Sequence, residues 1–370
     1  LRQIYFRCHF NFMKPLLIDT PFQEWNIKGL PSYRNKQIRK WIYEKGVLNF
    51  EKMSNLPLEV RKDLGNEWDL HAMELVRIQG SHDTTRKFLL KLRDGQLIES
   101  VLIPATQGTK GVRASRLTLC VSTQVGCALG CKFCASGLDG LKRNLSTGEI
   151  IGQIILARST AKRRIDNLVF MGMGEPLANL PAMIPALDQI LSPEGLGIGA
   201  RHITLSTSGL APKIIELSKY PAQIRLAISL HGGDNRTREQ IMPINKRYPI
   251  EELISACEKF IEERKKMITL EYILIKGVND DLGQASLLAK HAKRLNAKVN
   301  LIPYNKVDGL EWERPELSHI NSFHKLVEKE NASRVTLRME KGHDIAAACG
   351  QLRLKEKKSR NLTVLAKQTN

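Results

Sequence analysis

From Leu117 onward, short apolar runs alternate with longer stretches in which apolar residues recur at helical spacing. The stretch TGEIIGQIILARST, for example, places Ile150 and Ile154 on one helical face, and IEELISACEKFIEER does the same for Leu253 and Cys257. Six strands are expected, at Leu117–Ser122, Asn167–Met171, His202–Thr207, Ile224–Leu230, Ile268–Leu274 and Lys298–Tyr304. This alternation predicts an α/β fold, an incomplete (βα)6 barrel whose chemistry lies at the carboxyl ends of the strands.

The pattern before Leu117 is different. The segment from Ser32 to Lys45 places Ile38 and Trp41 on one helical face and ends at Gly46, and a second short helix is expected after Pro57. In RKFLLKLRDGQLIESVLIP, a DG turn between two alternating runs predicts a β hairpin. We therefore expect a small helical accessory domain, which either binds RNA or only packs, and then a short β extension with a linker.

The expected domain boundaries follow from these changes of pattern. They are a possible extension or targeting segment (1–14), the helical accessory domain (15–84), the β extension and linker (85–116), the barrel core (117–350) and a basic C-terminal tail (351–370). The chain begins at Leu1, and LRQIYFRCHFNF holds two arginines and no acidic residue, as organellar presequences do. Met13 is an equally good start. A cytoplasmic location is expected, or a plastid or mitochondrion if residues 1–12 are a presequence.

The net charge of the chain indicates which class of molecule it binds. Lysine and arginine outnumber aspartate and glutamate by 57 to 38, which gives a net charge of +19 and a pI near 9.7. Such an excess favours a polyanionic partner, nucleic acid above all, although a basic solvated surface would give the same number. No run approaches the roughly 18 consecutive apolar residues that would span a bilayer, so no membrane partner is expected.

The cysteines indicate the chemistry. The chain has seven, an odd number, and three of them fall in CALGCKFC, which argues against a secreted disulfide scaffold and for reduced thiols. Structural zinc normally takes four protein ligands, and no fourth cysteine or histidine follows within the next sixty residues. A four-iron cluster held by Cys127, Cys131 and Cys134 instead leaves one iron open to a substrate amino acid. This spacing, with Phe133 before the last cysteine, resembles the radical S-adenosylmethionine (SAM) superfamily, so we expect one [4Fe-4S] cluster and SAM.

Residues that suit SAM follow the next strands. GMGEP supplies glycines for close backbone approach and a carboxylate for a cationic amine. Polar residues at the ends of later strands could bind the ribose, carboxylate or adenine, although each alone is more often a turn residue. The expected SAM contacts are Gly174, Glu175, Ser206, Ser229, Leu230, His231 and Asn305.

Two of the four cysteines outside the cluster motif add to this prediction. In the first strand, the side chain of Cys120 alternates with those of Leu119 and Val121, so it could face the barrel interior. Cys349 lies in GHDIAAACGQL, just after the expected final strand RVTLRME. For each of them a buried apolar cysteine is the ordinary alternative.

Together these motifs resemble one family. LCVSTQVGCALGCKFCASG, VFMGMGEPLAN, HITLSTSG, LAISLHGGD, NLIPYN and DIAAACGQL are similar to the bacterial radical SAM enzymes that methylate C2 of adenosine in 23S ribosomal RNA, the RlmN family. The Cfr-type resistance methyltransferases, which modify C8, are close relatives. The resemblance runs from about residue 17 to residue 351.

The resemblance implies a two-SAM, ping-pong mechanism. Cys349 first takes a methyl group from one SAM; a second SAM is then cleaved to a radical that takes hydrogen from the S-methyl group, and the resulting methylene radical adds to adenine C2. The adduct loses its C2 proton, for which Glu99 is the implied acceptor, although a solvated edge-strand carboxylate is the alternative. Cys120 then attacks the Cys349 sulfur, which frees the RNA and leaves a disulfide.

The resemblance also implies substrates and partners. Adenosine 2503 of 23S rRNA is the implied target and adenosine 37 of tRNA a second one, with an electron donor such as flavodoxin or ferredoxin and a monomeric enzyme. The alternatives are C8 methylation of the same base, or a non-catalytic iron–sulfur protein that binds RNA. One departure from the bacterial pattern is the long link ATQGTKGVRASR between Pro104 and Leu117, which could alter the approach of Glu99 or add contacts to RNA.

Overall fold

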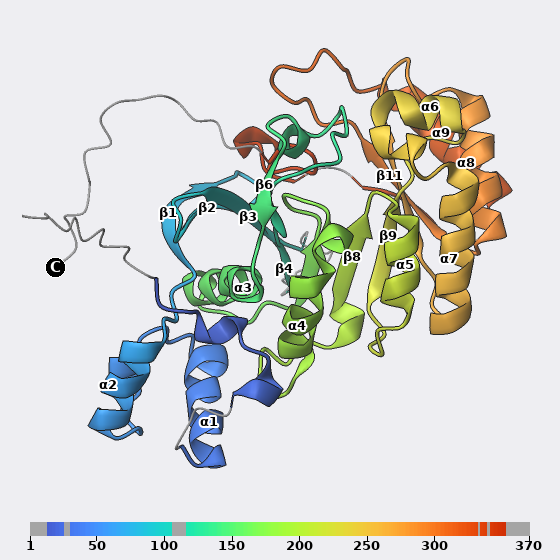
Figure 1. Cartoon of the computed structure of the whole chain (residues 1–370). Coiled ribbons are helices and arrows are strands. Elements are labelled where there is room, and N and C mark those ends of the chain that lie inside the picture. The colour runs from blue at the N-terminus through green and yellow to red at the C-terminus, as the bar shows by residue number, and fades with distance from the viewer. Residues whose placement is uncertain (1–12, 26–29, 106–115, 332–333, 339–340, 353–370) are drawn as a thin grey trace, which may run out of the picture.

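The computed structural model describes residues 13–25, 30–105, 116–331, 334–338 and 341–352. Its centre is one mixed sheet of ten strands (Figure 1). Seven of them are parallel to their neighbours. In sheet order these are β4 (Leu117–Cys120), β7 (Asn167–Phe170), β8 (Ile203–Thr207), β9 (Arg225–Ser229), β10 (Thr269–Leu274), β11 (Lys298–Pro303) and β12 (Val335–Leu337). The predicted α/β class and all six predicted strands are confirmed.

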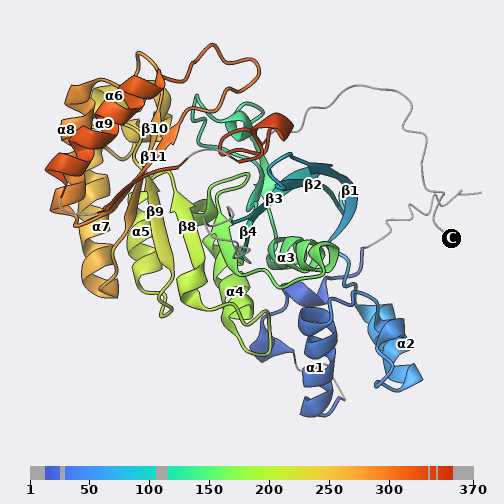
Figure 2. The ribbon, with the colours of Figure 1, turned by 180° about the vertical axis from the view of Figure 1, so that it is seen from behind.

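Helices connect these strands and pack in neighbouring pairs along the outside of the sheet (Figures 1 and 2). They are α3 (Thr147–Ala161), α4 (Leu180–Leu191), α5 (Ala211–Ser218), α6 (Asn235–Ile241), α7 (Ile250–Arg264), α8 (Leu282–Arg294) and α9 (Leu317–Glu330). In α3 a capping box between Ser146 and Glu149 satisfies the first turn, and Ile150 and Ile154 are buried, as their spacing predicts. Each helix therefore returns the chain so that the carboxyl ends of the parallel strands meet at one edge.

The N-terminal region holds the two predicted helices. Helix α1 (Ser32–Arg39) continues as a π-helical turn (Lys40–Glu44), and α2 (Leu58–Glu67) begins directly after Pro57. They project from the opposite end of the molecule to α8 and α9 (Figure 2). The hydroxyl of Tyr43 donates to Gln189 at 2.7 Å, so this region is fixed to α4.

The β extension is larger than predicted. The expected hairpin is present as β2 (Arg86–Leu92) and β3 (Leu97–Pro104), but β1 (Met73–Gly80), in a segment assigned to the helical domain, also pairs with β2. These three strands are antiparallel, and β3 pairs with β4. The extension therefore continues the sheet of the core and carries its residues to the same edge.

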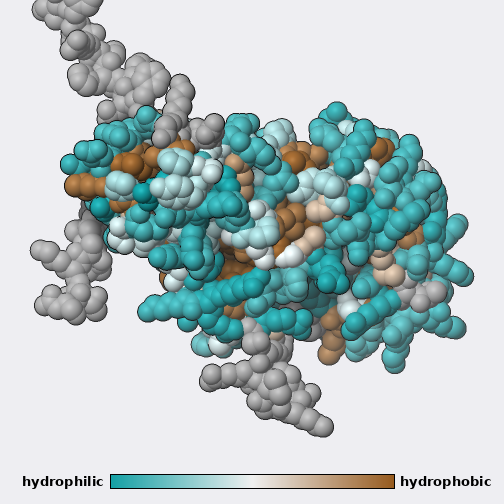
Figure 3. All heavy atoms as spheres, turned by 90° about the horizontal axis from the view of Figure 1, so that it is seen from below, coloured by the Kyte–Doolittle hydropathy of each residue, from teal (hydrophilic) through white to brown (hydrophobic). Residues whose placement is uncertain are grey.

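On the face shown in Figure 3 the described surface is largely hydrophilic, and its hydrophobic residues form small separate areas. Among the described helices none is both long and apolar enough to cross a membrane. Three predicted segments fall wholly or mostly outside the described residues: the possible targeting segment, the long link before Leu117 and the basic tail.

Candidate active site

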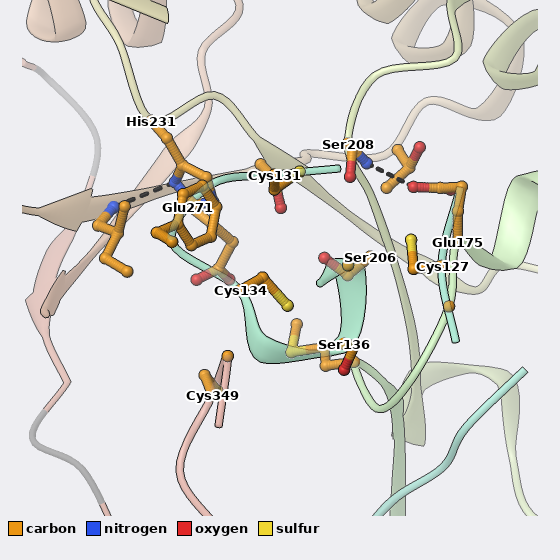
Figure 4. Close-up of a pocket in the computed structure, with 18 of the residues that line it drawn as sticks. Cys127, Cys131, Cys134, Ser136, Glu175, Ser206, Ser208, His231, Glu271 and Cys349 are labelled. Atoms are coloured by element: carbon orange, nitrogen blue, oxygen red, sulfur yellow. Dashed lines mark hydrogen bonds between the residues drawn. The ribbon is translucent and has the colours of Figure 1, made fainter. Parts of the chain in front are cut away.

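A cavity opens at the carboxyl ends of the parallel strands, and the three cysteines of CALGCKFC lie on its wall (Figure 4). Other predicted residues line the same cavity from neighbouring strands. The lining includes Cys127, Cys131, Cys134, Gly174, Glu175, Ser206, Ser229, His231 and Cys349, together with Glu271, which was not predicted. The structure thus brings most of the expected cluster and SAM residues to one place.

The cysteine loop is held by a small hairpin. Strands β5 (Gln124–Gly126) and β6 (Leu141–Asn144) pair antiparallel on either side of it. Gly126, directly before Cys127, has φ of +76°, and a Cβ atom there would lie 1.9 Å from the carbonyl oxygen of Gly140. Glycine is therefore needed where the two ends of the loop meet.

The three thiols suit a cluster better than a single ion. Burial raises the pKa of Cys127 to about 12, and it raises the pKa of Cys131 and Cys134 as well, while the charge of a thiolate at Cys134 also disfavours thiolates at Cys127 and Cys131. Thiolates at these positions therefore need a cationic partner. In the described part of the chain, no three metal-binding side chains converge closely enough for one ion. In a cubane each thiolate binds a different iron, so thiols spread around one cavity fit that group.

Glu175 lies on the wall of this cavity, and hydrogen bonds hold its carboxylate in place. The side chain is buried, and it accepts from the backbone N–H groups of Ser208 at 2.7 Å and Leu177 at 3.0 Å (Figure 4). Burial raises its pKa, which hydrogen bonds partly offset. A cationic amine in the cavity would compensate this charge, as the amine of SAM does in the predicted role.

His231 forms another part of the wall as a neutral ring. Its Nδ1 accepts from the backbone N–H of Ile273 at 3.1 Å, and its ring meets Phe133 edge to face at 4.9 Å. Burial, together with the charge of Arg238, lowers the pKa of His231 to about 3, so it remains uncharged. Leu230 is buried behind this wall, and its backbone groups bond to Glu271 and Arg238. The predicted SAM contact of Leu230 stays a prediction.

A second cavity adjoins the first, and Cys349 lines both. Cys120 lies on the wall of the second cavity, as its predicted inward orientation requires, and Arg338 and Lys341 line it as well. Asn305 belongs to this cavity, where its Nδ2 donates to the carbonyl oxygen of Cys349 at 3.3 Å. Cys120 and Cys349, two of the four cysteines outside the cluster motif, therefore share one cavity.

The pKa of Cys120 is raised to about 12. Burial is the largest cause and the neighbouring Cys349 adds to it, whereas the charge of Arg338 acts in the opposite direction. Arg338 also interacts with Cys349 and with Glu271, and its own pKa is raised mainly by Cys349. The charge of Arg338 thus favours the thiolate form of Cys120. Arg338 lies directly after the short final strand β12, and its position gave no signal in the sequence.

The loop that carries Cys349 is attached to the cluster loop. The backbone N–H of Ala135 donates to the carbonyl oxygen of Gly350, and the hydroxyl of Ser136 donates to that of Leu352, both at 2.7 Å. Cys349 therefore has a fixed position beside the cluster cysteines, at the junction of the two cavities.

Glu99 is buried on β3 and forms an ion pair with Lys87 on β2 at 3.1 Å. It is absent from the lining of both cavities. It lies on the same face of the sheet as Cys120, because Cys120 pairs with Val101, two residues along the strand. The acceptor role of Glu99 stays a prediction. Of the residues that were missed, Glu271 had a visible signal, a lone carboxylate inside an apolar strand.

Comparison with known proteins agrees with this geometry. Residues 121–286 match the model of the radical SAM superfamily, and residues 22–69 match that of the ribosomal RNA large subunit methyltransferase N-terminal domain. A probable dual-specificity RNA methyltransferase RlmN from Akkermansia muciniphila is 54% identical over 333 residues, which cover 90% of this chain and 92% of the relative.

Two further matches support the same assignment. The dual-specificity RNA methyltransferase RlmN of Nitratiruptor is 41% identical, over 92% of this chain and 98% of its own length. The crystal structure of a radical SAM methyltransferase from Sphaerobacter thermophilus superimposes with a TM-score of 0.86 at 40% identity, over 92% of this chain and 99% of that one. The chain therefore belongs to the RlmN family of radical SAM RNA methyltransferases.

Proposed function

We propose that this enzyme methylates C2 of an adenosine in 23S ribosomal RNA, adenosine 2503, by a methyl group that Cys349 carries. The observation that supports this most directly is that Cys349 lines two adjoining cavities. One cavity holds the three cluster cysteines and Glu175, and the other holds Cys120. A carrier that receives carbon in one cavity and delivers it in the other has to lie at their junction.

In this proposal Cys127, Cys131 and Cys134 bind the [4Fe-4S] cluster, and Glu175 binds the amine of SAM. Gly174, Ser206, Ser229 and His231 contact the remainder of SAM. Cluster and SAM together supply, when bound, an organic radical able to abstract hydrogen from a methyl group. Two SAM molecules are consumed in each turnover, because one donates the methyl group and the other provides the radical.

Cys349 acts first as a nucleophile. Its thiolate takes the methyl group by displacement, a reaction for which a thiolate is well suited. The S-methyl group then loses one hydrogen atom, and its carbon forms a bond to adenine C2. A radical route is needed because C2 lies between two ring nitrogens and is electron-poor, so it is a poor nucleophile for direct displacement on SAM.

Glu99 and Cys120 act in the release. After the adduct has passed one electron to an acceptor, a role that the oxidised cluster would fill, Glu99 takes the proton from C2 and restores the aromatic ring. The Cys120 thiolate then attacks the Cys349 sulfur, the bond from sulfur to the methylene carbon breaks, and that carbon takes up a proton. The product is methylated RNA and a Cys120–Cys349 disulfide, which an external thiol reductant must reduce before the next turnover.

The basic charge of the chain supports an RNA substrate. Its relatives are named as dual-specificity RNA methyltransferases, and we propose adenosine 37 of tRNA as a second substrate. We further propose that a flavodoxin or ferredoxin reduces the cluster and that the enzyme acts as a monomer.

The test is anaerobic reconstitution of the cluster followed by incubation with methyl-labelled SAM, RNA and reductant. The wild-type protein is expected to acquire label on Cys349 and to transfer it to RNA. Cys349→Ala abolishes both labels, and Cys120→Ala accumulates a covalent complex of protein and RNA. Digestion of the RNA distinguishes 2-methyladenosine, which is expected, from 8-methyladenosine, which would establish C8 methylation instead. A reduced cluster that neither binds nor consumes SAM would indicate a non-catalytic RNA-binding protein.

A further inference from the structure

The side chain of Arg238 on α6 is fully buried, with 0% exposure, although it carries a charge. Burial lowers its pKa to about 10, so it remains protonated at neutral pH. A buried charge is costly unless hydrogen bonds replace its hydration. The contacts of this guanidinium therefore indicate what it does for the enzyme.

Those contacts join the carboxyl ends of two neighbouring strands. Nη2 donates to the carbonyl oxygen of Ser208, after β8, at 2.6 Å, and more weakly to that of Ser229, at the end of β9, at 3.5 Å. Nε donates to the carbonyl oxygen of Leu230 at 3.0 Å, and Nη1 to the side-chain oxygen of Asn245 at 3.0 Å. All four acceptors are uncharged oxygen atoms, so geometry rather than charge neutralisation governs the arrangement.

The same contacts reach the carboxylate that faces the first cavity. The carbonyl of Ser208 accepts from Arg238, while the N–H of the same residue donates to Glu175 Oε2 at 2.7 Å. Arg238 thus fixes both the residue that orients Glu175 and the backbone beside Ser229. Helix α6 also meets the cluster loop, because the N–H of Lys132 donates to the carbonyl oxygen of Ile241 at 2.9 Å.

We propose that Arg238 is the positioning residue of the SAM site: it holds the ends of β8 and β9 at the spacing that SAM requires. Arg238 lines neither cavity, so it acts through Ser208, Ser229 and Leu230. The inference rests on the proposed function only in that this cavity binds SAM, and it is independent of the RNA substrate.

Lysine cannot replace this arrangement. Its ammonium is a point charge on a flexible stem, whereas the planar guanidinium presents several N–H groups in a fixed fork. Arg238→Lys therefore retains the charge and loses the geometry, and Arg238→Gln loses both. Arg236 lies on the same helix but is exposed, so Arg236→Gln is the matched control.

The first measurement is SAM affinity, by equilibrium dialysis with labelled SAM on the reconstituted protein without RNA. We expect Arg238→Lys to retain the iron content of the wild type and to bind SAM about tenfold more weakly or worse, which corresponds to the loss of one or two hydrogen bonds. At a SAM concentration equal to the dissociation constant of the wild type, the change that SAM causes in the electron paramagnetic resonance signal of the reduced cluster is expected to be about fivefold smaller in Arg238→Lys than in the wild type. Arg236→Gln is expected to match the wild type in both.

The second measurement is amide hydrogen exchange in the absence of SAM. Faster exchange at residues 206–209 and 229–231 of Arg238→Lys is expected, with helices α8 and α9 unaffected. Asn245→Ala removes one acceptor and keeps the guanidinium, so it serves as a milder variant with a smaller loss of SAM affinity if Arg238 variants fail to fold. SAM affinity and exchange equal to the wild type in the folded variants would overturn the inference. A wild-type protein that binds no SAM would instead overturn the proposed function.

Discussion

Lys87 and Glu99 form a buried ion pair between β2 and β3, with 3.1 Å between Nζ and Oε1. Lys87 Nζ also donates to the carbonyl oxygen of Ala346, in the loop that carries Cys349, at 3.2 Å. The register pairs Lys87 with Val101 and Val101 with Cys120, so this lysine and Cys120 lie on the same face of the sheet. The ion pair thus connects the proposed proton acceptor to the loop of the methyl carrier.

Glu99→Gln is expected to block the reaction after the adduct has formed. Removal of a general base typically costs about 100-fold or more in rate, and here the methylation of Cys349 would proceed because it precedes that step. Lys87→Met is expected to give the same pattern more weakly, because it removes the ion pair that helps to hold the carboxylate in place. The measurement is a ribonuclease-sensitive covalent complex on a denaturing gel, beside methylation of Cys349 by mass spectrometry.

Lys91→Met provides the control for these variants, since Lys91 is exposed on the same strand. It should release RNA as the wild type does. Free turnover by Glu99→Gln would exclude Glu99 as the proton acceptor.

Release of the RNA should become faster as pH rises. The pKa of Cys120 is raised to about 12, so its thiolate is the minor form at neutral pH and increases about tenfold for each pH unit between about pH 7 and pH 9. Arg338→Met removes the charge that favours the thiolate and should slow release at every pH. Rapid quenching of the adduct over this range measures the rate. A rate independent of pH would show that attack by Cys120 does not limit release.

Cluster binding should depend on the three cysteines of CALGCKFC alone. Cys127→Ser, Cys131→Ser and Cys134→Ser are each expected to lose most of the iron and the visible absorption of the reconstituted protein. Cys257→Ser is the matched control, because Cys257 is a buried thiol that lies on α7 and lines neither cavity. Full iron content in any of the three variants would contradict the assignment of that ligand.

Two glycines should respond in opposite directions to substitution by alanine. Gly126→Ala forces a Cβ atom against Gly140 at a positive φ, and it should lower the free energy of unfolding by about 2 kcal/mol or more and weaken cluster retention. Gly65→Ala lies within α2 with nothing within 4 Å of the new atom, and it should raise that free energy by up to about 1 kcal/mol. Chemical denaturation of the cluster-free protein measures both. Equal effects would argue against the tight closure of the cluster loop.

The core of the fold was predictable because its strands are buried and its helices show a clear apolar period. Strand β1 was not, because nearly all of its residues are exposed and the strand has a bulge between Leu75 and Arg77. Apolar and polar residues alternate on each side of this bulge, but the bulge interrupts the alternation that signals a half-buried strand. The two alternating pieces are each too short to separate the segment from the preceding helices.

The candidate site was predictable where its residues form local motifs. CALGCKFC and GMGEP each place their functional groups in one short loop. The contacts that the sequence did not predict join residues across the fold. Lys87 and Glu99 meet only through the hairpin register, and Arg238 is recognisable only from the backbone carbonyls that surround it. Neither relationship leaves a spacing in the sequence.

The central claim is that the carbon reaches RNA by way of Cys349, and SAM bearing a fully deuterated methyl group tests it most directly. Cys349 receives three deuterium atoms, one is lost before the carbon bonds to adenine C2, and a solvent proton replaces it at release. Mass spectrometry of the digested RNA should therefore show 2-methyladenosine with two deuterium atoms in its methyl group. A methyl group with all three deuterium atoms, or label in RNA from Cys349→Ala, would contradict the account.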